Sequence, residues 1–242
     1  MLRTFGRTVV LPTVGFTLGV GSFIKAWPDE AGAITLKDAV VPHLKSNRVI
    51  QRPDILEKIS QMKLYNDLLN NPSMNHSVQS EKIPRGHLAY HVGQGELFGP
   101  NRLEIDPLIF FDEENSKLVI FYHLGKDLGN EKGNVHKGVL SLLLDEALCY
   151  CGFPKLPSKR GVTAKLHVDF TKDIPVDSTV ILRADVTESK GRKCIIDGTL
   201  ETVPTKSLLT GKESETGTVF AKGNCILVEP KWFKYFTWLD MF

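Results

Sequence analysis

Two neighbouring acids, Asp145 and Glu146, interrupt an otherwise apolar stretch of the sequence. Residues 138–153 carry mainly leucine, valine, alanine, cysteine and tyrosine, a pattern that predicts a buried helix. An isolated charge in such a helix is expensive to bury unless it has a partner or a role. Desolvation by the surrounding leucines would raise the basicity of Asp145, so we predict a general base or nucleophile there. For Glu146 we expect exposure to solvent or a salt bridge, and for either acid a structural role is the alternative.

The segments on both sides of this helix read as strands. Residues 108–112 and 118–124 flank a polar turn and predict a hairpin before the helix. Four strand-like segments follow the helix, at about Val162–Phe170, Thr179–Glu188, Lys193–Val203 and Val219–Val228. A long antiparallel sheet of about six strands, wrapped around the central helix, would bury that helix, and a second subunit would cover the rest. We therefore predict an α+β fold of this kind.

The composition excludes several classes of function. With 242 residues, 42% of them hydrophobic, the chain can form one domain with appendages. A net charge of +2 does not favour nucleic acid as a partner. The four cysteines form no CxxC pair and lie in apolar runs, which argues against a zinc site and against a secreted disulfide framework. We expect a reducing compartment and neither a metal nor a redox cofactor.

Residues 134–148 read Asn-Val-His-Lys-Gly-Val-Leu-Ser-Leu-Leu-Leu-Asp-Glu-Ala-Leu. This segment resembles the His-Gly-Gly…Asp signature of phenylacetyl-CoA-type hotdog thioesterases, including mitochondrial members of the thioesterase superfamily. The resemblance extends over roughly residues 88–229. It implies a hotdog fold and makes Asp145, nine residues after His136, the nucleophile or general base.

The resemblance also implies roles for three other residues. A backbone N–H of Lys137 or Gly138 would polarise the thioester carbonyl, and Thr163 would lie in the same site. Lys137 replaces the first glycine of the signature, which keeps the amide donor but loses the conformational freedom of glycine. For His136 we expect a helix-entry residue that hydrogen-bonds the acyl or pantetheine portion, with a purely structural histidine as the alternative.

The activity that the resemblance implies is hydrolysis of acyl-CoA to a free acid and CoA, where CoA is part of the substrate. Unpaired amides at a helix start favour an oxyanion, and loss of one such donor typically costs about 3–4 kcal/mol of barrier. The first alternative is a non-catalytic acyl-CoA-binding or assembly module, which the lysine at position 137 favours. A hydratase or dehydratase on the same fold would need a catalytic histidine in the site.

A basic turn and the length of the helix predict how the site is completed. Lys190, Arg192 and Lys193 surround Gly191 and resemble the turn that would bind the coenzyme's phosphates, with a solvated turn as the alternative. Lys137 and Asp145 are eight residues apart, about 12 Å along a helix, so both cannot reach one carbonyl carbon. We therefore expect a homodimer, or a dimer of dimers, with antiparallel central helices, shared sites and inactive monomers.

The N-terminal region predicts an address rather than chemistry. Residues 1–28 are basic, with no acid before Asp29, which indicates mitochondrial targeting, with a secretory signal as the rival interpretation. Residues 9–24 form a 16-residue apolar run, shorter than the roughly 20 residues that span a bilayer, and a retained membrane anchor is an open alternative.

Three further divisions complete the predicted organisation. Residues 29–86 form a helical arm and linker, with a helix capped by Asp54 and a linker or covering loop over residues 72–85. The thioesterase-like domain spans residues 87–230, and residues 231–242 form an aromatic tail that packs over the core or an interface.

Overall fold

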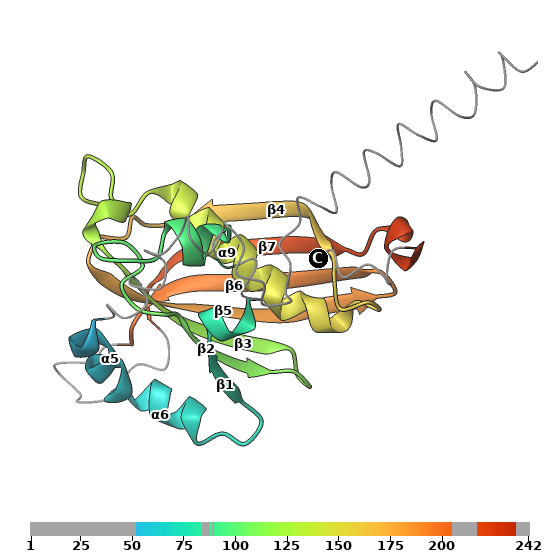
Figure 1. The fold of residues 1–242 in the computed structure, drawn as a ribbon, viewed down its shortest axis with the longest axis horizontal. Helices are drawn as coiled ribbons and strands as arrows, with labels where there is room; N and C mark the ends of the chain where they lie inside the picture. Colours follow the sequence, from blue (N-terminus) through green and yellow to red (C-terminus); the bar gives the residue numbers. More distant parts are fainter. Residues whose placement is uncertain (1–51, 84–87, 89, 205–216, 236–242) are drawn as a thin grey trace, which may run out of the picture.

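The computed structural model describes residues 52–83, 88, 90–204 and 217–235 (Figure 1). The predicted targeting segment, the anchor at residues 9–24 and most of the aromatic tail lie outside these residues. Among the described helices, none combines the length and the apolar character needed to cross a membrane.

A seven-stranded antiparallel sheet forms the body of the protein, in the order β1-β2-β3-β5-β6-β7-β4. The strands are β1 (Asn75–Val78), β2 (Leu108–Asp112), β3 (Lys117–Leu124), β4 (Val162–Phe170), β5 (Ser178–Lys190), β6 (Lys193–Thr202) and β7 (Val219–Val228). The six strands predicted from the sequence are therefore confirmed. The seventh strand, β1, was not predicted. Its residues were assigned to the linker, and they pair with β2 at the edge of the sheet.

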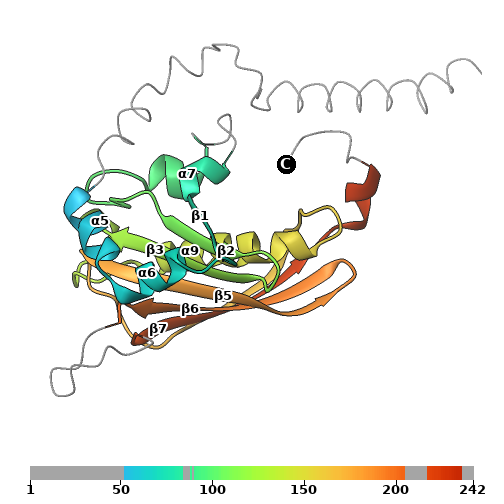
Figure 2. The ribbon, with the colours of Figure 1, turned by 90° about the horizontal axis from the view of Figure 1, so that it is seen from below.

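The long central helix, α9 (Lys137–Gly152), lies across one face of the curved sheet (Figure 2). It contacts β3, β4, β5, β6 and β7, and its inner face is formed by Leu140, Leu143, Leu144, Ala147, Leu148 and Cys151. This arrangement confirms the hotdog fold, because the apolar helix is buried by the antiparallel sheet that wraps around it. The strand β4 ends the sheet and has no neighbour on its outer side among the described residues.

Two glycines let α9 approach the sheet closely. Gly198 on β6 pairs with Gly223 on β7, and both lie beneath Leu148 of the helix. A Cβ atom at position 198 would lie 2.7 Å from Leu148 Cδ2 and 2.9 Å from the Arg183 carbonyl oxygen. The helix can therefore approach the sheet this closely only if position 198 lacks a side chain.

Gly198→Ala is expected to lower the free energy of unfolding by about 1–3 kcal/mol, because the methyl group overpacks the helix–sheet interface. Chemical denaturation of the purified full chain measures this change. Gly223→Ala is the milder comparison, since a Cβ there would first meet a leucine methyl at 3.0 Å. If Gly198→Ala had the same free energy of unfolding as wild type, the close packing of α9 on the sheet would be contradicted.

The arm contributes two helices, α5 (Pro53–Ser60) and α6 (Lys63–Leu69), rather than one continuous helix. They form a second apolar cluster on the opposite face of β2, β3 and β5, with Ile59 beside Phe110 and Phe121. Asp54 was expected to cap the first helix. Arg52 occupies the cap position instead and makes no side-chain cap, while its guanidinium pairs with Asp54 at 2.7 Å.

Shorter turns connect these elements. They are α7 (Gln79–Lys82), a π-helical turn η2 (Val92–Glu96), and the 3-10 turns η3 (Lys126–Leu128), η4 (Phe153–Lys155) and η5 (Lys231–Tyr235). Of the aromatic tail, Phe233 is buried and contacts the ring of Trp232 with centroids 4.6 Å apart.

Candidate active site

Asp145 lies on the half-exposed side of α9, beside the edge strand β4. Thr163 Oγ1 donates a hydrogen bond to Asp145 Oδ1 at 3.0 Å, so the structure brings together these two predicted site residues. Thr163 precedes an irregularity in the pairing of β4 with β7, between Thr163 and Lys165, of the kind that re-aims side chains near active sites. Within the described residues, no cationic side chain forms an ion pair with Asp145. The carboxylate is therefore oriented by a hydroxyl and has no cationic partner among the described residues.

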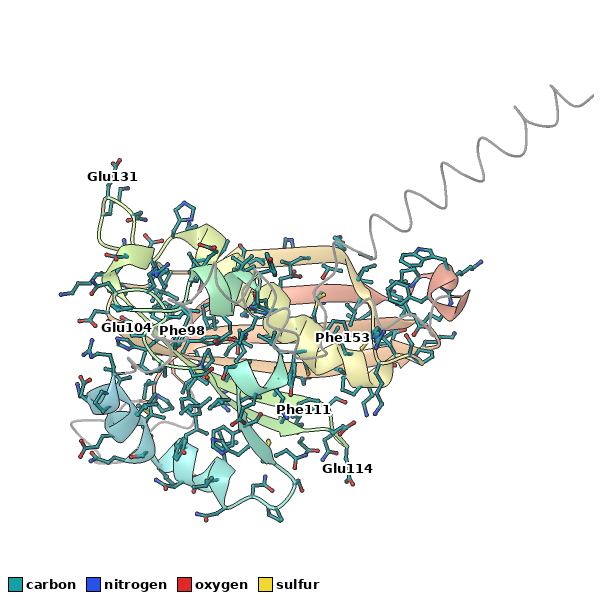
Figure 3. The ribbon with its side chains drawn as sticks, in the orientation of Figure 1. Phe98, Glu104, Phe111, Glu114, Glu131 and Phe153 are labelled. Carbon is teal, nitrogen blue, oxygen red and sulfur yellow. The ribbon has the colours of Figure 1, made fainter. Side chains whose placement is uncertain are left out.

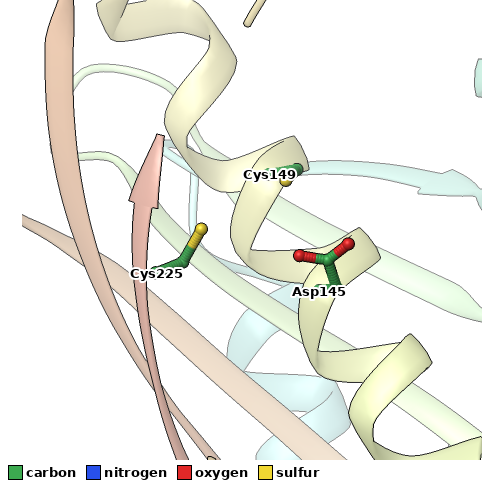
Figure 4. A group of neighbouring side chains, drawn as sticks. All are labelled: Asp145, Cys149 and Cys225. Atoms are coloured by element: carbon green, nitrogen blue, oxygen red, sulfur yellow. The ribbon is translucent and has the colours of Figure 1, made fainter. Parts of the chain in front are cut away.

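Two thiols for which the sequence predicted no role lie beside this carboxylate. Cys149, one helical turn after Asp145, has its sulfur 3.1 Å from Thr163 Oγ1. The sulfur of Cys225 on β7 points toward the helix (Figure 4), and the ligand atoms of Asp145, Cys149 and Cys225 all lie within 4.8 Å of one another. The pKa of the Cys149 thiol is raised, mainly by its hydrogen bond with Cys225 and to a smaller extent by burial. The four-residue spacing of Asp145 and Cys149 was the only part of this group that the sequence could have shown.

The start of α9 holds the predicted amide donors. His136 occupies the N-cap position, and its Nδ1 accepts a hydrogen bond from Gly138 N–H at 3.0 Å. The amides of Val139 and Leu140 donate to the carbonyl oxygen of His136. Lys137 N–H is then the first-turn amide for which the described residues provide no acceptor. Of the two predicted oxyanion donors, Lys137 is thus better placed than Gly138.

The helix start and Asp145 do not form one site within a single chain. Lys137 and Asp145 belong to the same uninterrupted helix, which keeps them about 12 Å apart along its axis. The Lys137 side chain is 59% exposed, with Nζ 5.3 Å from the centre of the Phe170 ring and 4.0 Å from Asp173 Oδ1.

The predicted phosphate-binding turn connects β5 and β6. Gly191 adopts a positive φ of 60°, and Arg192 Nη1 donates to the Glu229 carbonyl oxygen at 2.8 Å. The turn lies near the C-terminal end of α9, because Ser189 Oγ reaches the Lys155 carbonyl oxygen at 3.4 Å. The turn is therefore at the opposite end of the helix from His136. Lys190 and Lys193 are exposed there.

Glu146 faces away from Thr163, toward the helix α7 and the turn η2. Gln79 Nε2 donates to Glu146 Oε2 at 3.2 Å, and His91 Nδ1 lies 3.7 Å from Oε1. The Gly93 amide also binds this carboxylate, and a Cβ atom on Gly93 would approach Oε2 to 2.9 Å. Of the two expectations for Glu146, exposure to solvent is wrong, since only 18% of its side chain is exposed, whereas His91 lies at salt-bridge distance and would form the ion pair when protonated. The arm and the turn η2 therefore pack against α9 at the position of this acid.

Burial raises the pKa of Glu146 from 4.5 to about 7, and Asp145 adds to the shift. The other titratable groups around it are Tyr122 on β3 and His91, whose own pKa is lowered by burial. Because the folded state binds the proton more tightly, the native protein holds more protons than the unfolded chain between these two pKa values. The contribution of Glu146 to stability is therefore greatest at acidic pH and falls as the pH rises from about 4.5 to about 7.

Glu146→Gln is expected to become more stable, relative to wild type, as the pH rises from 5 to 8. The difference in free energy of unfolding should grow by about 2–3 kcal/mol, as the desolvated carboxylate ionises only in the wild type. Denaturant titrations at both pH values measure it. Glu114→Gln in the exposed turn between β2 and β3 (Figure 3) is the control, and its difference from wild type should not change. If the free energies of unfolding of Glu146→Gln and wild type changed equally between the two pH values, the assigned burial of Glu146 would be contradicted.

Comparisons with known proteins agree with the fold. The family model for the thioesterase superfamily matches residues 132–207, which include α9 and Thr163. MIOREX complex component 3 of Saccharomyces cerevisiae is 56% identical over all of this chain and 97% of its own length. An uncharacterized mitochondrial protein of Candida albicans is 43% identical over the full length of both chains.

More distant similarities cover only part of the chain. The acyl-coenzyme A thioesterase THEM4 of Rattus norvegicus is 27% identical over 42% of this chain and 43% of its own length. Among solved structures, a phenylacetic acid degradation-related protein of Ralstonia eutropha has a TM-score of 0.44 and 18% identity, over 61% of this chain and 93% of that one. From the family match, the two full-length relatives and the helix-in-sheet architecture, we conclude that the chain belongs to the thioesterase superfamily.

Proposed function

We propose that this protein hydrolyses acyl-CoA thioesters, with Asp145 as the general base or nucleophile. The observation that supports this most is the environment of Asp145. Its carboxylate lies on the half-exposed face of an apolar helix, is oriented by the Thr163 hydroxyl at 3.0 Å and has no cationic partner among the described residues. A structural acid in such a helix would be expected to have an ion-pair partner.

The reaction requires a new bond to the thioester carbon and loss of the thiolate. As a general base, Asp145 would take a proton from water while the oxygen attacks the carbonyl carbon, and the tetrahedral oxyanion would collapse to acid and CoA thiolate. As a nucleophile, Asp145 would displace the thiolate and form an anhydride that water then hydrolyses. In both routes negative charge develops on the carbonyl oxygen, so an amide donor such as Lys137 N–H must face it.

The donor would come from a second copy of the chain. The strand β4 is an edge, and its inward side chains Leu166, Val168 and Phe170 remain only partly buried against the core. Leu142 is also half-exposed, on the side of α9 that carries Asp145. A second copy of the chain, related by a two-fold axis beside β4, would cover these apolar groups. Its helix α9 would then lie antiparallel to the first copy's α9 and beside it. We propose a homodimer, or a dimer of dimers, in which each Asp145 faces the helix start of its partner.

Cations at the mouth of the site would bind the coenzyme. The bond from Arg192 to the Glu229 carbonyl oxygen holds the β5–β6 turn in place, and Lys190 and Lys193 are exposed on it. Ammonium groups on such a turn suit the phosphates of CoA. His136 is engaged with Gly138, so its proposed contact with the acyl or pantetheine portion would use the remaining ring nitrogen, Nε2.

The relatives suggest where this activity takes place. One full-length relative is named as mitochondrial, and the basic segment of residues 1–28 has the charge bias of a mitochondrial presequence. We propose a mitochondrial location, and for residues 9–24 a membrane anchor is the further proposal. The yeast relative is named as a component of a complex, so a protein partner is proposed as well.

The second candidate is a non-catalytic acyl-CoA-binding or assembly module. Two observations favour it: Lys137 stands where the family signature has glycine, and the Gly138 amide is already bound by His136. Release of CoA from acyl-CoA esters of increasing chain length, measured beside calorimetric binding of the same esters, separates the candidates. Turnover supports the hydrolase, whereas binding of an acyl-CoA without CoA release would leave only the binding module.

A further inference from the structure

Two clusters of potential metal ligands occur among the described residues. One contains Glu104, His123 and Asp177, and the other contains Asp145, Cys149 and Cys225. In the first, the Arg52 guanidinium lies 3.1 Å from Glu104 and 3.9 Å from Asp177, so a positive charge is already present. The second cluster has no such cation within the described part of the chain. The first cluster therefore already has a cationic partner, whereas the second has none and contains thiols.

The second cluster has the donors that a thiophilic divalent cation prefers. Two sulfur atoms and one carboxylate converge from α9 and β7, with their ligand atoms within 4.8 Å of one another (Figure 4). In a tetrahedral zinc site, bonds of about 2.0–2.3 Å place such atoms roughly 3.5 Å apart. Small side-chain rotations of Asp145 and Cys149 would close that difference. Three protein ligands leave one coordination position open.

Contrary to the expectation from the cysteine spacing in the sequence, we propose that Asp145, Cys149 and Cys225 form a binding site for Zn²⁺ or a similar thiophilic divalent cation. Cys225 is fully buried and provides the floor of the site, while Asp145 and Cys149 are half-exposed and provide a path for entry. Thr163 orients an outer ligand, since its hydroxyl donates to Asp145 Oδ1 at 3.0 Å and also lies 3.1 Å from Cys149 Sγ, so that its one proton can serve either atom. Hydrogen bonds of this kind orient metal ligands and increase affinity. Binding would release the thiol protons to solvent.

The site has a consequence that rests on the proposed function. A metal ion bound to Asp145 uses the same carboxylate that would activate water or attack the thioester. Metal binding and hydrolysis would therefore exclude each other, and Zn²⁺ would inhibit turnover.

Metal binding is tested without reference to activity. The reduced, metal-free full chain is titrated with Co²⁺, followed by thiolate-to-cobalt charge-transfer absorption, and with Zn²⁺ against a chromogenic chelator. We expect one ion per chain, with affinity at least about 100-fold lower in Cys149→Ala and Cys225→Ala. Cys194→Ala is the matched control, because Cys194 is equally buried but lies outside the cluster. Absence of a stoichiometric thiolate–cobalt signal in the wild type overturns the proposal, as does unchanged affinity in both cluster variants.

Inhibition is measured separately. If the enzyme hydrolyses acyl-CoA, Zn²⁺ should inhibit wild type and Cys194→Ala at the concentrations that fill the site, and a chelator should restore turnover. Cys225→Ala should need at least about 100-fold more Zn²⁺. Metal binding without any acyl-CoA hydrolysis would count against the proposed function alone. Hydrolysis without a thiolate–cobalt signal would count against the metal site alone.

Discussion

Asp145→Asn should lose most acyl-CoA hydrolysis, with kcat/KM lower by about 10²–10⁴-fold. Asparagine keeps the size of the side chain and can still accept a hydrogen bond from Thr163, but it can neither take a proton from water nor form the anhydride. The variant should therefore bind acyl-CoA with nearly unchanged affinity. Steady-state CoA release and calorimetric binding measure the two properties.

Asp127→Asn is the matched control for this change. Asp127 is an exposed aspartate in the turn η3, outside the group around Asp145, and its replacement should leave turnover at the wild-type level. Thr163→Val removes the hydroxyl that orients Asp145 and should give a smaller loss than Asp145→Asn. Full activity of Asp145→Asn would end the hydrolytic proposal for this residue.

Lys137→Pro should lower kcat by about 10²–10³-fold, while Lys137→Ala keeps activity close to wild type. Proline removes the backbone N–H that we propose as the oxyanion donor, and alanine removes only the side chain. The backbone accepts proline here because Lys137 is the first residue of α9, where proline is well tolerated. The preceding His136, with φ −65° and ψ 130°, already has the extended conformation that proline requires. Equal losses in both variants would place the effect in the lysine side chain.

The same variant tests whether sites are shared between chains. If the Lys137 amide of one chain serves Asp145 of another, a mixed dimer of Lys137→Pro and Asp145→Asn contains one intact and one doubly altered site. An equal mixture of exchanging chains should then recover about one quarter of wild-type turnover, although each variant alone is nearly inactive. Tagged chains show by affinity capture that mixed dimers formed. Mixed dimers without recovered turnover would mean that both groups act within one chain.

Local sequence patterns were sufficient for most secondary structure. The predicted helix over residues 138–153 corresponds to α9, and the predicted strand Val162–Phe170 coincides with β4. These elements have strong periodic or continuous apolar patterns, which depend on residues close together in the chain. The strand β1 escaped prediction because its four residues, Asn-His-Ser-Val, are mostly polar and become a strand only by pairing with β2.

The candidate site divides in the same way. The acid at position 145, its apolar surroundings and the histidine–glycine entry to the helix could be recognised from neighbouring residues alone. The contact between Gln79 and Glu146 joins residues 67 positions apart, and no local pattern announces it. The contact between the arm and the residue next to Asp145 could therefore not be predicted from the sequence.

A short-range apolar pattern was enough to predict a buried helix, the strands around it and an unusual acid within it, because helix and strand periodicity are properties of adjacent residues. Folding alone placed Cys225 beside Asp145, engaged the Gly138 amide with His136 and buried Glu146 against the arm. These outcomes depend on how β7, the helix cap and the arm pack in space. Side-chain contacts between distant segments are set by that packing, which a linear pattern does not encode.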